Sequence, residues 1–184
     1  MATGYFDIET RFLFDDVGGF KNADKLRLSV ACLIVDDGPP VFYEEEDAPR
    51  LLQDLSGLDK IVGHNVLRFD YVVLNPYVDY DVVRRLAPKT RDTLQMIYRD
   101  TKIRVSLNNL AKNNIGSVKS GNSVDMPRLW REGQKDTVKE YCAYDVELTK
   151  AVYLFGRENG YVVFTKYDKY DRSQSEQVKL MVSW

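Results

Sequence analysis

Two acidic residues near the start of the sequence have the spacing of a metal site. Asp7 and Glu9 lie two residues apart in the run YFDIET, and residues two apart on a strand face the same side. Two carboxylates at short range repel, so one of them is driven toward protonation unless a cation lies between them. Oxygen ligands of this kind suit Mg²⁺ or Mn²⁺, whereas zinc prefers cysteine and histidine. The alternative is that the pair lies on a solvated strand face.

A second acid, Asp70, follows Phe69 in the run GHNVLRFD. We predict that a strand ends at the start of this run and that a helix carries Asp70, with Asn65 as a candidate cap of that helix. A helical acid beside bulky apolar residues either belongs to a site or lies on the solvated side of an amphipathic helix.

A third pair, Tyr141 and Asp145, lies in the run YCAYDVELTK. The two residues are four apart on a predicted helix, so they share one face and lie one turn apart. Apolar residues of the same helix, such as Val138 and Val152, fall on or near that stripe, so the face points inward. An acid on an inward face is costly unless it is paired or binds a metal.

The elements that must position these acids follow from periodicity and turn residues. We predict strands over 4–10, 25–37, 41–45 and 60–65 and a strand ending near Asp92, helices over 45–58, 66–77, 93–101, 106–114, 122–133 and 135–159, and a hairpin over 161–184. The short connections between the first three strands imply antiparallel pairing. The later alternation of helix and strand indicates an α/β fold with a mixed sheet. No linker divides the 184 residues, so we expect one domain, with its core over 4–158.

The charge of the chain is unevenly distributed. Residues 1–83 contain 7 Lys or Arg and 16 Asp or Glu, a net charge of −9, whereas residues 84–139 contain 13 and 5, a net charge of +8. A basic segment is an electrostatic footprint for a polyanion such as nucleic acid, although a solvated helix surface gives the same pattern.

The composition of the chain indicates a protein without membrane-spanning segments or a disulfide framework. No apolar run approaches the roughly 20 residues that span a bilayer, so we expect no membrane partner. The start of the sequence lacks the pattern of a secretion signal. Cys32 and Cys142 match neither a zinc site nor a disulfide framework, and we expect both to be small buried residues of a cytoplasmic protein.

Taken in order, the three acidic motifs resemble those of the DEDD superfamily of 3′–5′ exonucleases, which includes proofreading domains of DNA polymerases and ribonuclease D. FDIET resembles the Asp-x-Glu of the first motif, NVLRFD the second motif, and YCAYD the Tyr-x(3)-Asp form of the third. Glu140 occupies the position where the histidine subtype has its histidine, so the match is to the tyrosine subtype, DEDDy. The whole chain is most similar to a bacterial RNase H-like branch that occurs alone or attached to DEAD/DEAH-type helicases.

The resemblance implies an RNase H-like fold and a two-metal mechanism. Two Mg²⁺ ions, with Mn²⁺ as a substitute, would be held by Asp7, Glu9, Asp70 and Asp145, with Asp7 bridging both. In such sites one ion lowers the pKa of the attacking water, and the other stabilises the leaving 3′ oxygen.

The resemblance also implies roles for residues around the metals. Tyr141 would orient the attacking water, because a side chain with a pKa near ~10 is a poor base unaided. Asn65 and Phe69 would support the substrate. For the only histidine, His64, a role in the local turn or in packing is the alternative to a substrate contact. Asp92 is expected to cap a helix or to support the metal ligands from outside.

The activity implied is release of 5′-mononucleotides from free 3′ ends of single-stranded DNA or RNA, with a helicase as a second candidate partner. The alternatives are an inactive nucleic-acid-binding adaptor and a structure-specific endonuclease on the same fold. Four retained acids argue against the adaptor, which has no physical reason to keep carboxylates that repel one another. The basic residues that would guide the phosphate backbone are Arg84, Arg85, Lys89, Arg91, Lys102, Arg104, Lys112 and Lys119.

Overall fold

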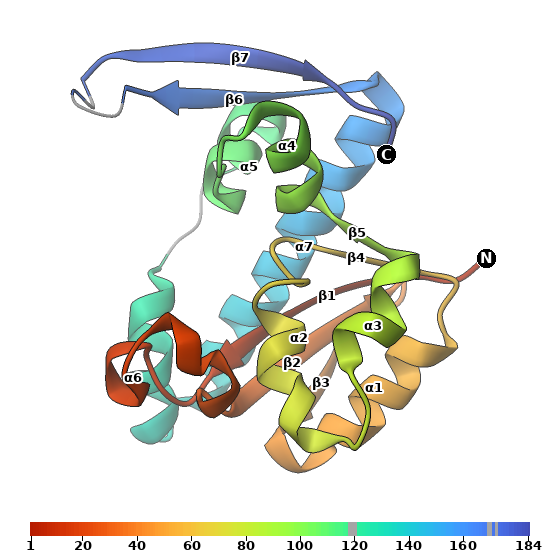
Figure 1. The fold of residues 1–184 in the computed structure, drawn as a ribbon, viewed down its shortest axis with the longest axis vertical. Helices are drawn as coiled ribbons and strands as arrows, with labels where there is room; N and C mark the ends of the chain where they lie inside the picture. Colours follow the sequence, from red (N-terminus) through yellow and green to blue (C-terminus); the bar gives the residue numbers. More distant parts are fainter. Residues whose placement is uncertain (118–120, 169–170, 172) are drawn as a thin grey trace.

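Five strands form one mixed sheet in the order β3-β2-β1-β4-β5 (Figure 1). The computed structural model describes residues 1–117, 121–168, 171 and 173–184. The strands are β1 Thr3–Thr10, β2 Leu28–Val35, β3 Val41–Glu44, β4 Lys60–Gly63 and β5 Thr90–Asp92. The first three strands pair antiparallel, and β4 and β5 continue the sheet from β1 in parallel. This confirms the predicted RNase H-like mixed sheet.

Helices cover both faces of this sheet (Figure 1). One face packs against α1 Ala48–Gly57, α2 Asp70–Leu74 and α3 Val82–Leu86. The other face packs against α6 Met126–Arg131 and α7 Lys135–Asn159. The helices α4 Thr93–Thr101 and α5 Leu107–Ile115 follow β5, and α5 packs on α7. Short 3₁₀ turns lie at Asp15–Val17, Phe20–Lys25, Glu45–Asp47, Asn75–Tyr77, Ala87–Lys89 and Ser123–Asp125.

The alternation of side chains along β1 decides which face receives the acids. Phe6 and Ile8 are buried in the core under α1, α2 and α3. Tyr5 is buried on the opposite side, in the core under α7. Asp7 and Glu9 lie on the same face of the strand as Tyr5, because residues two apart share a face. The acids of β1 therefore face the layer that contains α7.

The longest predicted helix and the C-terminal hairpin are confirmed. The helix α7 covers Lys135–Asn159 and ends at Gly160, whose φ of 72° is the left-handed conformation typical of a helix C-terminus. The hairpin consists of β6 Tyr161–Tyr167 and β7 Ser175–Met181, paired antiparallel. It lies across α5 at one end of the molecule (Figure 1).

The helix predicted over 66–77 is shorter in the structure, where α2 covers only Asp70–Leu74. Asn65 takes a left-handed backbone conformation, with φ of 71°, and does not cap the helix, because Phe69 occupies the N-cap position. Turns replace the first predicted helical turn, since the side chain of Asp92 binds the backbone amides of Asn65 and Leu67.

Cys32 and Cys142 are both buried and unbonded to one another, as expected for small core residues. Among the residues described, no helix is long and apolar enough to cross a membrane.

Candidate metal centre

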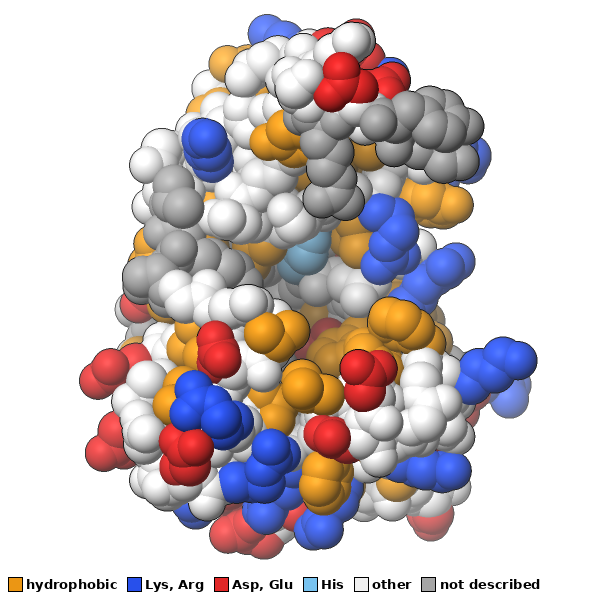
Figure 2. Space-filling model, turned by 90° about the vertical axis from the view of Figure 1, so that its left-hand side faces the viewer, with side chains coloured by type: hydrophobic (Ala, Val, Ile, Leu, Met, Phe, Trp, Pro, Cys, Tyr) orange, Lys and Arg blue, Asp and Glu red, His pale blue; other side chains and the backbone are white. Residues whose placement is uncertain are grey.

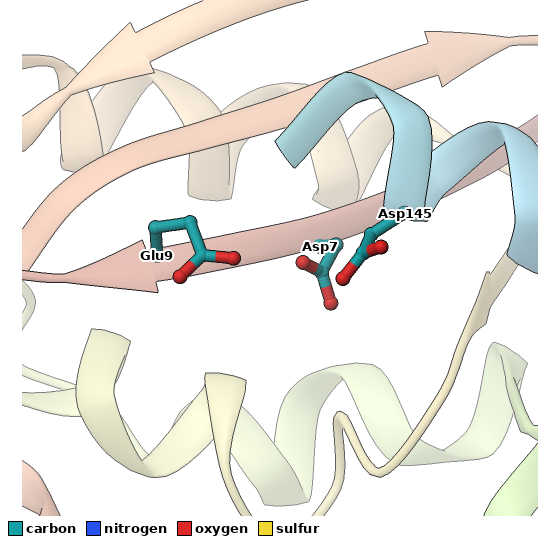
Figure 3. Close-up of side chains that lie close together, drawn as sticks. All are labelled: Asp7, Glu9 and Asp145. Atoms are coloured by element: carbon teal, nitrogen blue, oxygen red, sulfur yellow. The ribbon is translucent and has the colours of Figure 1, made fainter. Parts of the chain in front are cut away.

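Three acids from two distant segments meet on the α7 side of the sheet. Asp7, Glu9 and Asp145 each offer a carboxylate oxygen, and these oxygens lie within 4.8 Å of one another. Figure 3 shows the carboxylates of Asp7 and Asp145 side by side, with Glu9 further along β1 and its carboxylate directed back toward Asp7. The shared face of Asp7 and Glu9 is the one that their spacing predicts.

Packing of α7 on β1 holds Asp145 at this position. The thiol of Cys142, three residues before Asp145, donates a hydrogen bond of 3.4 Å to the backbone carbonyl oxygen of Asp7. Burial, and after it the charge of Asp7, raise the pKa of that thiol, so it remains a protonated donor. Further along α7, the ring of Tyr153 packs edge-on against Tyr5 of β1, with 6.2 Å between centroids. These contacts fix the turn of α7 that carries Asp145.

Asp70 approaches the same strand from its open edge. The strand β4 pairs with β1 only at Thr3, Gly4 and Tyr5, and among the described residues no other strand pairs with the later part of β1 on that edge. Asp70, the first residue of α2, accepts a hydrogen bond from the backbone amide of Ile8 in β1, and only 2% of Asp70 is exposed. Asp70 is not among the three acids within 4.8 Å of one another, and it lies close enough to Asp7 for their charges to repel.

The environment of Asp70 disfavours its charged form. Burial is the first cause that raises its pKa well above the ordinary value, and the negative charge of Asp7 is the second. Backbone hydrogen bonds from the amides of Asp70 itself and of Ile8 act in the opposite direction and are outweighed. One carboxylate oxygen of Asp70, Oδ1, is buried without a hydrogen-bond partner among the described residues.

These acids fit a divalent cation. A buried carboxylate oxygen without a donor, beside three more carboxylates that repel, is an arrangement that a bound cation would neutralise. The ligands are all oxygen atoms, which suits a hard ion such as Mg²⁺ or Mn²⁺.

Two clefts meet at Asp7 and Asp145, and both residues line both of them. The first, which we call the aromatic cleft, has a volume of about 290 Å³ and contains Glu9; its apolar wall includes Phe12, Leu13, Phe14, Leu26, Phe69 and Pro127. The second, which we call the polar cleft, has a volume of about 400 Å³; its polar lining includes His64, Asn65, Arg104 and Ser106, and Leu94, Val105 and Leu107 complete it. Figure 2 shows the hollow in this face of the molecule, with hydrophobic side chains along its lower rim.

The three predicted substrate contacts divide between these clefts. In the polar cleft, His64 Nδ1 lies 2.9 Å from Thr93 Oγ1, and Asn65 Oδ1 accepts a hydrogen bond of 3.2 Å from Arg104. In the aromatic cleft, the ring of Phe69 packs edge-on against Phe14, with 5.9 Å between centroids. All three side chains therefore lie next to the acids.

Asp92 is the helix cap that its position predicts, and it also binds a neighbouring turn. Its Oδ1 accepts a hydrogen bond from the backbone amide of Gln95 and so caps α4. Its two oxygens also bind the amides of Asn65 and Leu67, at 2.9 and 3.0 Å. Asp92 thereby positions the turn between β4 and α2, which leads to Asp70.

Tyr141 lies next to the acid cluster but in a different cleft. Only 8% of the residue is exposed, and its ring packs in the core under α7. It lines a cleft of about 480 Å³ together with Asp125, Thr137 and Tyr144. Within the described part of the chain, neither the aromatic nor the polar cleft includes Tyr141 in its lining.

The basic residues proposed to guide the backbone have different environments. Arg104 lines the polar cleft. Lys89 has a structural role, because its Nζ donates hydrogen bonds to the carbonyl oxygens of Ser56 and Leu58. The guanidinium of Arg85 lies over the ring of Tyr80, at 4.4 Å from its centroid. Lys119 lies outside the described residues.

Sequence reasoning missed the aromatic wall contributed by Phe12 and Phe14. The run RFLFDD directly follows the first acidic motif, and its alternating aromatic residues were the available signal. Arg11 and Arg27 flank the segment between β1 and β2, and both form ion pairs with Glu45, at 3.0 and 2.7 Å, which tie this segment to the end of β3.

The comparisons with known proteins show the fold. No protein-family model and no curated protein sequence matches the chain. Among solved structures, it is similar to the family B DNA polymerase from the hyperthermophilic archaeon Pyrobaculum calidifontis, with a TM-score of 0.65 and 15% identity. The match covers 85% of this chain and 24% of the polymerase, so the chain corresponds to about a quarter of that protein. At this identity, the similarity establishes a shared RNase H-like architecture.

Proposed function

We propose that this chain is a metal-dependent nuclease that hydrolyses phosphodiester bonds of nucleic acid at the Asp7–Glu9–Asp145 cluster. The observation that carries the proposal is the meeting of these carboxylates within 4.8 Å at the junction of two clefts. Two Mg²⁺ ions, or Mn²⁺ in their place, are the cofactors that this donor set favours, with Asp70 as the fourth ligand.

The fold supports nucleic acid as the substrate class. One solved structure that the chain resembles is a DNA polymerase. Arg104 supplies a cation in the polar cleft, where a phosphate of the bound strand would lie beside Asn65 and His64. The wall of Phe14 and Phe69 offers apolar rings on which a base can stack.

Each residue has a distinct part in the proposed reaction. The bound ions would supply an activated water and stabilise charge at phosphorus. Asp7 lies between Glu9 and Asp145 and is the carboxylate best placed to bind both ions. Tyr141 orients the attacking water through its hydroxyl, as the third motif suggests, and Asn65 and Arg104 hold the substrate phosphate.

The finer proposal is a 3′–5′ exonuclease of the DEDDy type that releases 5′-mononucleotides. It rests on the order and spacing of the three motifs. Two clefts that meet at the acids suit a strand end, because a terminal nucleotide can occupy the aromatic cleft while the rest of the strand leaves through the polar cleft. The structure-specific endonuclease remains the alternative.

The test is degradation of labelled DNA and RNA, single- and double-stranded, with Mg²⁺ or Mn²⁺. Linear strands with a free 3′ end should yield 5′-mononucleotides, and 3′-blocked or circular single strands should survive. Asp7→Asn should abolish cleavage, whereas Asp79→Asn, at an exposed acid that lines neither cleft, should retain it. Cleavage of closed circles would support the endonuclease instead, and binding without any cleavage would support the inactive adaptor.

A further inference from the structure

A third cleft lies between the segment that precedes α5 and the C-terminal hairpin. We call it the hairpin groove. It has a volume of about 910 Å³, and its lining includes Lys102, Arg104, Ser106, Thr165, Lys166 and Asp168. The hairpin groove therefore joins the end of α4 to the strand β6, which follows α7 in the sequence.

The hairpin groove adjoins the polar cleft. Arg104 and Ser106 line both, and the polar cleft also contains Asp7 and Asp145. A strand that leaves the acids through the polar cleft would meet the hairpin groove at Arg104. The two clefts thus offer a path from the acid cluster to the hairpin.

Asparagine side chains of α5 hold the hairpin at a fixed position over this path. Asn109 donates to the carbonyl oxygen of Thr165 and accepts from its amide, at 2.7 and 2.9 Å. Asn114 makes the same pair of hydrogen bonds with Val163, at 2.7 and 2.8 Å. Thr165 and Val163 are two residues apart on β6, so the two amides bind the edge of the strand as a neighbouring strand would. These contacts hold β6 on α5 and so fix the position of the wall that β6 contributes to the hairpin groove.

The charge of the hairpin groove suits a polyanion. Lys102, Arg104 and Lys166 contribute three positive side chains, against Asp168 in the same lining. Lys166 also contacts Glu176, at 2.6 Å, across the hairpin. Exposed ion pairs of this kind contribute little, so Lys166 can exchange this partner for a phosphate.

The direction of Lys166 supports its place on the path. Lys166 lies two residues after Phe164 and four after Val162, both of which are buried against α5 and α7, so it shares their face, which is directed toward the molecule. Lys179 pairs with Val163 in the register of the hairpin and so belongs to the opposite face. It lies over the ring of Tyr161, at 3.7 Å from the centroid. The hairpin thus has one lysine, Lys166, on the side of the groove, and a second, Lys179, on the opposite face that can serve as its control.

We propose that the hairpin groove binds the sugar–phosphate backbone of the nucleic-acid strand that extends away from the cleaved bond, so that the C-terminal hairpin is part of the substrate-binding surface. This inference rests on the proposed nuclease function, and it assigns Lys102 and Lys166 as phosphate contacts. The contacts are to phosphates, so binding should depend on strand length and salt and be tolerant of sequence.

The test measures binding without catalysis. Fluorescence anisotropy with a labelled single strand of about 16 nucleotides, the upper end of the site size of one single-strand-binding OB fold, is recorded in EDTA for wild type and for the double variant Lys102→Gln/Lys166→Gln. We expect roughly 10-fold weaker binding at low salt. The slope of log affinity against log salt should fall by about 0.7 for each phosphate contact that is lost. Lys179→Gln should bind as wild type, and Glu176→Gln, which frees Lys166, should bind more tightly.

A second measurement separates this inference from the nuclease proposal. With Mg²⁺ present, the double variant should show a larger rise in KM on the long strand than on a dinucleotide, which is too short to reach the hairpin. Equal affinity, equal salt slope and equal KM in wild type and double variant would overturn the hairpin groove as a binding site even if cleavage is robust. Lysine-dependent binding with no cleavage of any substrate would support the groove and refute the nuclease. A melting temperature equal to that of wild type shows that the double variant is folded.

Discussion

The backbone amide of Asn65 donates a hydrogen bond to Asp92 Oδ1 over 2.9 Å, which joins the turn after β4 to the start of α4. The same buried carboxylate accepts from the amides of Leu67 and Gln95. One side chain thus satisfies three backbone donors. It holds Asn65, which lines the polar cleft, and the turn that leads to Asp70.

The first prediction concerns Asp92→Ala. This change leaves three backbone amides without their acceptor, and each unsatisfied buried donor costs about 1–3 kcal/mol. We expect a loss of unfolding free energy of at least about 2 kcal/mol, measured by urea denaturation. We also expect weaker divalent-ion binding by calorimetry, because the turn that leads to Asp70 loses its support.

A simple helix cap is the control for this experiment. Asp81 caps α3 through the single amide of Arg84 and contacts neither cleft. Asp81→Ala should cost about 1 kcal/mol, the usual value for a cap, and leave ion binding unchanged. If Asp92→Ala costs no more than Asp81→Ala and binds ions normally, Asp92 is only a helix cap.

The second prediction concerns metal ions and stability. Ions that bind only the folded protein stabilise it by RT ln(1 + [L]/Kd), which is about 2–3 kcal/mol at a hundredfold excess over Kd. Millimolar Mn²⁺ should therefore raise the Tm of wild type, and Asp7→Asn should reduce this rise, since it removes the carboxylate at the centre of the cluster. Differential scanning calorimetry provides the measurement, with Asp79→Asn as the control. An unchanged Tm in wild type, together with no heat of binding, would count against a metal site.

The third prediction concerns pH and Asp70. Its pKa is raised in the folded protein, by burial first and by Asp7 second. The unfolded chain releases this proton near pH ~4, whereas the folded chain holds it to higher pH. Raising the pH from about 4 toward the folded pKa therefore destabilises metal-free wild type. Asp70→Asn removes this pH-dependent loss of stability. The new side chain keeps an oxygen that can accept the hydrogen bond from the Ile8 amide.

Metal-free Asp70→Asn should consequently melt higher than wild type at pH 7–8. A gain of about 1–2 kcal/mol corresponds to about 2–8 °C for a domain of this size. The difference should disappear near pH ~3.5, where the unfolded acid is also protonated, and it should reverse when Mn²⁺ is added, because the variant lacks a ligand. A constant difference across this pH range would show that Asp70 is not the source.

Much of the fold could be predicted because its signals are local. The alternation along β1 and the periodicity of α7 are each contained in one stretch of sequence, and so is the left-handed Gly160 that ends the helix. The shared face of Asp7 and Glu9 follows from the strand period alone.

The remaining features depend on contacts between distant segments. The turns over 66–69 replace a helix because Asp92 binds the backbone amides of Asn65 and Leu67. Local helix propensity cannot predict a contact with a residue so distant in the sequence. The hydrogen bonds from Asn109 and Asn114 to β6 likewise form only when β6 packs against α5. For the same reason, periodicity placed Tyr141 on the inward face but could not predict which cleft its ring would line.

The last prediction concerns the hydroxyl of Tyr141. Tyr141→Phe removes one polar group and keeps a ring that is buried under α7, so folding and ion binding should barely change. If the hydroxyl orients the attacking water, the turnover rate should fall by roughly 10- to 1,000-fold, the range for loss of a positioning or proton-transfer group. Asp145→Ala should be worse, because it removes a metal ligand from the cluster.

The control lies in the same cleft. Tyr144 lines it beside Tyr141, three residues later on α7, and is outside the proposed site, so Tyr144→Phe should turn over as wild type. The measurement is the single-turnover rate at saturating enzyme on one labelled oligonucleotide. A slower Tyr141→Phe would show that the hydroxyl acts in the reaction, although the ring lines a neighbouring cleft. Equal rates for wild type and Tyr141→Phe would make Tyr141 a packing residue, and the DEDDy assignment would be withdrawn while the metal site stands on Asp7, Glu9 and Asp145.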